Sequence, residues 1–145
     1  MLVKLAPLLP DFLMASRLTL QRKPHTRSVV VPLSVLRGIK LFATDVDGVL
    51  TDAGMYYSET GDEWKKFNTR DGMGIKLLQR AGIITAIVTQ ERTKLVARRA
   101  EKLAIPELHQ GVMDKLAVIR EMAARHGLSL EQVAYIGDDV NDLEA

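Results

Sequence analysis

KLFATDVDGVLTD, residues 40–52, carries more information than any other part of this chain. A short apolar run ends in two aspartates one residue apart, and a glycine and a Thr-Asp pair follow. Two carboxylates at the end of a strand repel each other unless a cation or a reaction requires them. Asp45 and Asp47 therefore indicate a site for a hard metal ion, or a nucleophile beside its acid/base partner.

The composition is that of one soluble globular domain. The chain has 145 residues, of which 47% are hydrophobic and 26% charged, enough for a real core. It contains no cysteine, so disulfides, thiolate zinc sites and thiol catalysis are excluded. This composition fits a cytoplasmic protein.

Charge is distributed unevenly along the chain. Residues 1–40 contain seven Lys or Arg and one acid, Asp11, whereas residues 41–145 have a net charge of −4. The sequence pI of about 9.0 therefore belongs to the N-terminal segment. Because the remainder is mildly acidic, we expect no nucleic-acid partner.

Residues 1–35 are predicted to be a disordered N-terminal extension, ahead of a folded domain at 36–145. The segment is interrupted by prolines, and its apolar run is too short to span a bilayer, so no membrane association is expected. Its basic, acid-poor composition leaves a targeting segment, an interaction arm or a start site assigned too early as alternatives. The prolines are Pro7, Pro10, Pro24 and Pro32.

Strands and helices alternate from residue 38 onward. The apolar patterns predict buried strands at 39–44, 83–88 and 133–136, a short strand at 108–110, and helices at 71–81, 92–103 and 114–126. A hairpin is expected from 55–57 and 64–67 around the turn 59–62. In the first helix, Ile75, Leu77 and Leu78 are expected to face inward. This order favours an α/β fold, a parallel sheet with helices on both faces.

Polar and acidic residues follow three of the predicted strands. Ligands bind beyond the carboxyl ends of the strands in such sheets, so these residues should meet at one edge. They are Asp45 and Asp47, then Thr89, then Asp138, Asp139 and Asp142.

This set fits the cleavage of a phosphate monoester. That reaction needs an in-line nucleophile, neutralisation of the phosphoryl charge and a proton for the leaving alcohol. Asp45 is the expected nucleophile and forms an aspartyl-phosphate, while Asp47 is the expected acid and base. Thr89 and Lys115 are expected to bind the phosphoryl oxygens, and Lys115 also keeps Asp45 ionised.

Mg²⁺ is the expected cofactor, because it prefers oxygen ligands and keeps several waters. Its predicted ligands are the carboxylates of Asp45 and Asp138 and the backbone carbonyl of Asp47. Asp142, one helical turn after Asp138, is expected to orient the bound waters from behind, together with Asp139.

Four motifs in this order resemble the haloacid dehalogenase superfamily: DVDGVLTD, the threonine of IVTQ, the lysine of QGVMDK, and GDDVND. The resemblance runs from about Leu36 to the end of the chain and implies a Rossmann-like fold. Only a hairpin separates the first motif from the helix near Asp71. This is similar to the capless branch that dephosphorylates 3-deoxy-2-keto sugar acids, as octulosonate 8-phosphate or nonulosonate 9-phosphate.

The segments GMYYSETGDEWKKFNTRDGMGI and ARRAEKL resemble the nonulosonate members more closely. Octulosonate enzymes commonly have Gly-Arg after the second-motif threonine, where this chain has Gln90-Glu91. The resemblance implies that Glu91, with Arg99 and Lys102 of a neighbouring subunit, contacts the sugar. It also implies a homotetramer in which the hairpin 55–67 is the flap that covers the open site. Family members continue for a further strand, helix and tail, so the predicted domain is short at its C-terminus.

Each of these residues also has a simpler interpretation. Asp45 and Asp47 could be turn residues, and the acids at 138–142 could be a solvated loop with a helix N-cap. Thr89 and Lys115, taken singly, are typical of a strand end and a solvated helix. Arg99 and Lys102, with Arg98 beside them, are typical of a solvated helix face. For the aromatic residues, packing within the hairpin is favoured over a platform for the sugar; they are Tyr56, Tyr57 and Trp64. The three histidines show no shared metal-ligand spacing; they are His25, His109 and His126.

The leading hypothesis is thus a Mg²⁺-dependent phosphatase for a sugar-acid phosphate. A catalytically weak oligomerisation module, as can occur where such domains are fused to sugar cytidylyltransferases, is the alternative from another class. A broad phosphatase for small esters is the third hypothesis.

Overall fold

The computed structural model describes residues 31–145. Residues 1–30, most of the predicted extension, lie outside the described residues. Helix α1 (Leu33–Gly38) crosses the predicted boundary at residue 36 and buries none of its side chains. No helix among residues 31–145 is long and apolar enough to cross a membrane.

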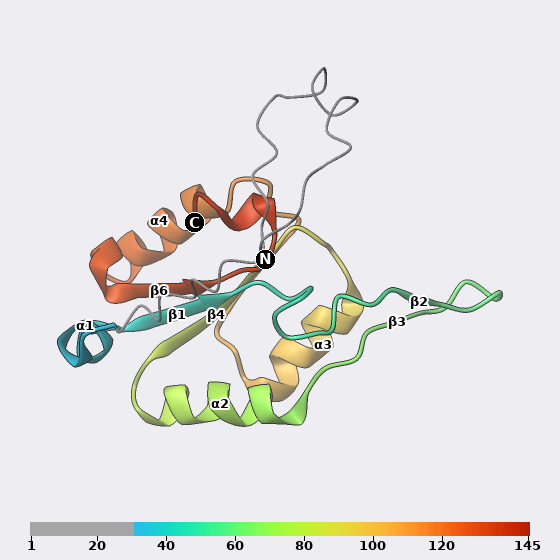
Figure 1. The fold of residues 1–145 in the computed structure, drawn as a ribbon, viewed down its shortest axis with the longest axis horizontal. Helices are drawn as coiled ribbons and strands as arrows, with labels where there is room; N and C mark the ends of the chain where they lie inside the picture. Colours follow the sequence, from blue (N-terminus) through green and yellow to red (C-terminus); the bar gives the residue numbers. More distant parts are fainter. Residues whose placement is uncertain (1–30) are drawn as a thin grey trace, which may run out of the picture.

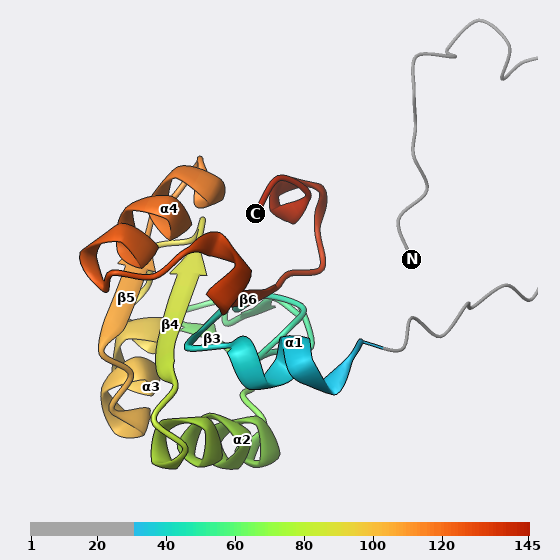
Figure 2. The ribbon, with the colours of Figure 1, turned by 90° about the vertical axis from the view of Figure 1, so that its left-hand side faces the viewer.

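A parallel four-stranded sheet forms the centre of the fold, in the order β5-β4-β1-β6 (Figures 1 and 2). The strands are β1 (Leu41–Thr44), β4 (Ile84–Thr89), β5 (Glu107–Gln110) and β6 (Val133–Ile136). β1 pairs with β4 on one side and with β6 on the other, so the order reverses at β1. The α/β fold with a parallel sheet is confirmed.

Helices cover both faces of the sheet, as predicted. Helices α2 (Thr69–Arg80) and α3 (Lys94–Leu103) lie on one face, and α4 (Lys115–Arg125) lies on the other (Figure 1). One apolar cluster joins the sheet to the α2 and α3 side: Val46, Leu50, Ile75, Ile87, Val96, Ala100, Leu103 and Ile105. The second joins it to α4: Leu41, Ala43, Ala86, Val88, Ile119 and Met122.

Two predictions about burial were wrong. Leu77 was expected on the inner face of α2, but it is 55% exposed. It follows the buried Ile75 by two positions, which places it on the opposite side of a helix with 3.6 residues per turn. Strand β6 was expected to be buried, but it lies at the edge of the sheet and its Ile136 is 47% exposed.

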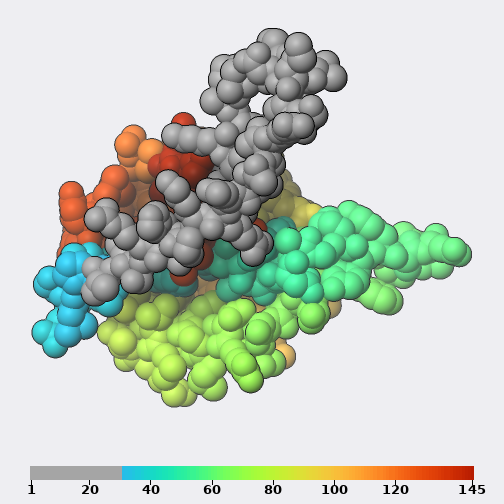
Figure 3. Space-filling model, in the orientation of Figure 1, coloured from blue at the N-terminus to red at the C-terminus, as the bar shows by residue number. Residues whose placement is uncertain are grey.

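The predicted hairpin is present as β2 (Tyr56–Tyr57) and β3 (Glu63–Trp64), and it projects from the body of the molecule (Figures 1 and 3). An isolated antiparallel bridge between Thr51 and Phe67 holds its base. Tyr57 is 69% exposed and Trp64 63% exposed, so the structure does not bury these rings within the hairpin.

Two of the histidines share one acid at the end of the sheet opposite the carboxyl ends of the strands. Glu107, at the start of β5, accepts hydrogen bonds from His109, Arg125 and His126. Burial alone would raise the pKa of Glu107, but these partners outweigh it and hold the pKa below its usual value. His25 lies outside the described residues.

Candidate active site

The carboxyl ends of three strands open into one cleft of about 530 Å³. Asp45 directly follows β1, Thr89 ends β4, and the Asp138 segment follows β6. Most of the predicted site residues therefore meet, as expected from the topology. The lining residues are Asp45, Asp47, Ala53, Thr89, Gln90, Glu91, Asp138, Asp139 and Asn141.

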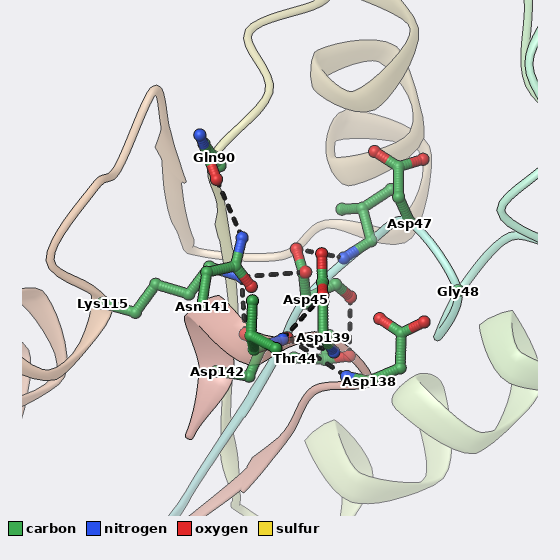
Figure 4. Close-up of polar contacts among 12 residues, drawn as sticks. Thr44, Asp45, Asp47, Gly48, Gln90, Lys115, Asp138, Asp139, Asn141 and Asp142 are labelled. Atoms are coloured by element: carbon green, nitrogen blue, oxygen red, sulfur yellow. Dashed lines mark hydrogen bonds and ion pairs between the residues drawn. The ribbon is translucent and has the colours of Figure 1, made fainter. Parts of the chain in front are cut away.

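Asp45 is held in a fixed orientation at the floor of this cleft. Its side chain is nearly buried, and the backbone N–H of Val46 donates to its Oδ1 over 2.7 Å. The Nζ of Lys115 donates to its Oδ2 over 2.8 Å (Figure 4). Both contacts stabilise the ionised carboxylate, which is the form that a nucleophile requires.

Lys115 is the first residue of α4 and is 2% exposed. Its Nζ also lies 2.5 Å from Oδ1 of Asp142. Burial would lower the pKa of Lys115, but the hydrogen bonds to Asp142 and Asp45 outweigh it and raise the pKa. The amine is therefore a cation between two carboxylates, below the cleft rather than on a solvated helix face.

Asp142 has both carboxylate oxygens occupied by donors. Lys115 and the hydroxyl of Tyr135 donate to Oδ1, each over 2.5 Å. The backbone N–H groups of Asp138 and Asp139 donate to Oδ2 over 3.1 Å. Asp142 therefore shapes the loop that carries Asp138, and its predicted place behind the metal ligands stays a prediction. Tyr135 was not predicted, because a tyrosine within a strand carries no spacing signal.

Asp138 has the character of a metal ligand. Its carboxylate is exposed and accepts no hydrogen bond from another residue among 31–145, and oxygens of Asp45, Asp138 and Asp142 lie within 4.8 Å of one another. Partial desolvation and the charges of Asp45 and Asp142 raise the pKa of Asp138. A hard divalent cation would relieve this repulsion, so the donor set fits Mg²⁺.

Gly48 makes room for that carboxylate. A Cβ at position 48 would lie 1.7 Å from Oδ2 of Asp138, and the φ of Gly48 is +81°. Any larger residue would be strained and would occupy the place of Asp138. The glycine of DVDGVLTD is therefore a requirement of the acidic cluster as well as of the turn.

Asp47 lies on the other side of the cleft, and its carboxylate points away from the Asp45–Asp138 cluster (Figure 4). Its Oδ1 accepts from Nζ of Lys65 over 2.6 Å and from the hydroxyl of Thr51 over 3.3 Å. The same Nζ forms an ion pair with Glu91. Burial and the nearby Asp47 raise the pKa of Glu91 against the opposing effect of Lys65.

Two further polar residues, Gln90 and Asn141, line the cleft and were not predicted as site residues. Asn141 Nδ2 donates to Gln90 Oε1 over 2.8 Å, which joins the loop after β4 to the loop after β6. The side chain of Thr89, predicted to bind phosphoryl oxygens, lies beside them and is 2% exposed. Its predicted role in binding phosphate stays a prediction.

Arg99 and Lys102 do not line the cleft in the single chain. Arg99 Nη2 donates to the carbonyl of Asn68 over 2.8 Å, and its guanidinium lies 5.4 Å from the centroid of the Phe67 ring. Lys102 lies on the exposed side of α3. The resemblance places both at the site of a neighbouring subunit, so their substrate role stays a prediction.

The known proteins that this chain resembles in sequence and in structure are phosphatases and related hydrolases. The 3-deoxy-D-manno-octulosonate 8-phosphate phosphatase of Yersinia pestis is 47% identical over 104 residues, 72% of this chain and 56% of that protein. A Legionella pneumophila protein described as a HAD superfamily (subfamily III A) hydrolase aligns with a TM-score of 0.74 and 40% identity, over 77% of this chain and 61% of its own. The chain belongs to the haloacid dehalogenase superfamily. No family model matches the chain.

A further haloacid dehalogenase relative was crystallised with ligands. The 3-deoxy-D-manno-octulosonate 8-phosphate phosphatase of Moraxella catarrhalis, in complex with magnesium ion, phosphate ion and KDO, aligns with a TM-score of 0.74 and 42% identity. The alignment covers 77% of this chain and 64% of that one. The chain thus spans little more than half of the length of the curated relatives that it matches. The predicted closer likeness to nonulosonate members stays a prediction.

Proposed function

We propose that this chain is a phosphatase for the phosphate monoester of a 3-deoxy-2-keto sugar acid. The observation that carries the proposal is Asp45, nearly buried and hydrogen-bonded by Lys115, beside the exposed carboxylate of Asp138 in an open cleft. The relatives named as octulosonate 8-phosphate phosphatases support octulosonate 8-phosphate as the first substrate to test.

In the first step, an oxygen of Asp45 attacks phosphorus while the bond from phosphorus to the sugar oxygen breaks. Asp47 gives its proton to that oxygen, so the sugar acid leaves as the neutral alcohol. Lys115 remains protonated throughout and stabilises charge on Asp45 and the phosphoryl group.

In the second step, water attacks phosphorus of the aspartyl-phosphate and gives a proton to Asp47. The bond from phosphorus to the Asp45 oxygen breaks, which restores the carboxylate and releases inorganic phosphate. Asp47 is again protonated, and the cycle is balanced in atoms and charge.

Mg²⁺ is the metal that we propose for the acidic cluster. The carboxylates of Asp45 and Asp138 and the carbonyl of Asp47 would hold it, with Asp142 and Asp139 fixing the loop behind them. When bound, the ion supplies positive charge for the phosphoryl oxygens.

The substrate could have eight or nine carbons. Glu91 is engaged by Lys65 here, so the feature that favoured the nonulosonate substrate has a local explanation in this chain. Steady-state kinetics on octulosonate 8-phosphate and nonulosonate 9-phosphate would separate the two.

The direct test of the reaction is phosphate release with Mg²⁺ from both esters by the wild type and by Asp45→Asn. We expect the substitution to lower kcat/KM by at least about 10³-fold, because the amide is not a nucleophile. Activity that survives Asp45→Asn would exclude Asp45 as the nucleophile. A panel of small esters with no preference for keto-sugar acids would favour the broad phosphatase.

We also propose that four chains associate around the hairpins. Exposed apolar side chains on the projecting hairpin support an interface there, among them Met55, Tyr57 and Trp64. Light scattering of the wild type and of Trp64→Ser would test this, and a monomeric wild type would contradict it. A tetramer without Mg²⁺-dependent turnover would favour the oligomerisation module.

A further inference from the structure

Lys65 connects three separate segments at the edge of the cleft. It lies between β3 and the bridge that closes the hairpin base, and its side chain is 1% exposed. Its Nζ lies 2.6 Å from Oδ1 of Asp47, in the loop after β1. On its other side it forms an ion pair with Glu91, in the loop after β4. The buried ammonium of Lys65 keeps its charge through the ion pair with Glu91 and the hydrogen bond that it donates to Asp47.

The contacts distinguish the two oxygens of Asp47. Thr51 and Lys65 both donate to Oδ1. No hydroxyl, amide or ammonium donor among residues 31–145 reaches Oδ2, and the carboxyl group of Glu91 lies against the same side chain. Because a carboxyl group carries a single transferable proton, fixing Oδ1 as the acceptor of protein donors leaves Oδ2 to hold the proton and face the leaving oxygen.

We propose that Lys65 is a positioning residue that orients Asp47 for proton transfer to the leaving group, with Glu91 holding Lys65 in place. Lys65 contacts the side chain of Asp47, and none of its hydrogen bonds or ion pairs within residues 31–145 reaches the acids at 138–142. In the proposed step it neither gains nor loses a proton. The transferred proton moves from Asp47 to the sugar oxygen as its bond to phosphorus breaks. Glu91 thereby acts on the reaction through Lys65, apart from any contact with the sugar.

The inference rests on the proposed phosphatase function and predicts a specific pattern of lost activity. Esters with basic leaving groups need the proton from Asp47, whereas 2,4-dinitrophenyl phosphate leaves without one. A mispositioned Asp47 should therefore slow the cleavage of esters with basic leaving groups selectively. The quantity to compare is kcat/KM, because it reports the steps up to cleavage of the ester and is independent of the later hydrolysis.

The experiment compares the full chain with its Lys65→Met variant on a series of phosphate esters with Mg²⁺. We expect kcat/KM to fall about 10²-fold or more for an alkyl phosphate and about 3-fold or less for 2,4-dinitrophenyl phosphate. Lys66→Met is the matched control: Lys66 is its neighbour, its side chain is 74% exposed, and within residues 31–145 it pairs only with Asp52. It should leave both values unchanged.

Two more variants keep the inference falsifiable if Lys65→Met folds poorly. Glu91→Gln should give the same selectivity with a smaller loss, and Lys65→Arg should recover part of the alkyl phosphate activity. Equal losses on all esters would overturn the inference and leave the phosphatase function intact. A wild type that turns over no ester would instead overturn the proposed function, and this inference with it.

Discussion

Lys115 shows how one buried cation can stabilise two carboxylates at once. It is nearly inaccessible, and both of its partners, Asp45 and Asp142, are buried. A buried ion pair adds little stability compared with an apolar core. The loss of one member lowers stability strongly, because the remaining charge is left buried without water or a counter-ion. The lysine is therefore as important for stability as for chemistry.

Lys115→Met should destabilise the protein by about 3–5 kcal/mol at neutral pH, because it leaves Asp45 and Asp142 buried without a cation. Chemical denaturation gives the value. The loss should shrink on acidification, because protonation of Asp142 removes a buried charge that Lys115 no longer offsets. Lys94→Met, at the exposed first position of α3, is the control and should change stability by less than about 0.5 kcal/mol. An equal effect of both substitutions would contradict this account.

Glu107 provides a second residue-scale prediction, on pH. Its folded-state pKa lies below the ordinary value of 4.5, so it stabilises the protein above that value. The contribution is lost as the pH falls through the folded pKa. Glu107→Gln should therefore cost about 1–2 kcal/mol at pH 7 and nothing once the wild-type carboxylate is protonated. Thermal unfolding of both proteins between pH 7 and pH 3 would measure the difference, and a constant difference would refute the prediction.

The contact between α2 and α3 is the clearest feature at the scale of elements. A Cβ at Gly72 would lie 2.8 Å from Nη2 of Arg99, so the glycine gives the guanidinium space to reach the carbonyl of Asn68. Asn68 is also the N-cap of α2. Arg99 therefore supports the start of this helix in the single chain.

Arg99→Ala should lower the free energy of unfolding by about 1 kcal/mol, through the lost hydrogen bond and the lost contact with Phe67. Arg98→Ala, an exposed neighbour on the same helix, should change it by less than about 0.5 kcal/mol. Denaturant titration of both variants measures stability, and KM on the keto-acid phosphates measures substrate binding. A raised KM with unchanged stability would favour the substrate role implied by the resemblance.

The elements were largely predictable from the sequence, and the contacts between them were not. Apolar runs closed by acids fixed the strands well, because burial on both faces of a parallel sheet needs such runs. The first turn of α2 was missed, since Asn68 caps the helix ahead of the expected Asp71. Lys65 was missed because its partners Asp47 and Glu91 lie on segments distant in sequence. Tyr135 was missed because a tyrosine within a strand has no spacing signal, although its partner Asp142 follows in the next loop.

The acidic cluster matters at the scale of the whole molecule, because it affects stability with and without metal. The pKa of Asp138 is raised above 3.8 by partial desolvation and by the charges of Asp45 and Asp142. The folded state thus holds this proton more tightly than the unfolded state does. Without metal, the charge of Asp138 therefore costs stability as the pH rises from 3.8 through the folded pKa.

Mg²⁺ should raise Tm by several degrees. At a concentration about 100 times its Kd, it should raise the free energy of unfolding by about 2.7 kcal/mol. Asp138→Asn should abolish the rise. Without metal at pH 7, it should leave the protein at least as stable as the wild type, because it removes like-charge repulsion. Thermal unfolding with and without MgCl₂ tests both points, with KCl at equal ionic strength as the control. A Mg²⁺ response that persists in the variant would place the metal elsewhere.

Among the described strands of the four-stranded sheet, β1 is synthesised first and its neighbour β6 last. Lys115 follows Asp45 by 70 residues, and Asp142 follows Lys115 by a further 27. Contacts between such distant segments form slowly in folding chains. On the ribosome, a nascent chain that ends before residue 142 carries the paired aspartates but cannot complete the charge cluster around the lysine. The charge cluster is therefore assembled only after Asp142 has been synthesised, so the contacts around Lys115 report that β6 has joined the sheet.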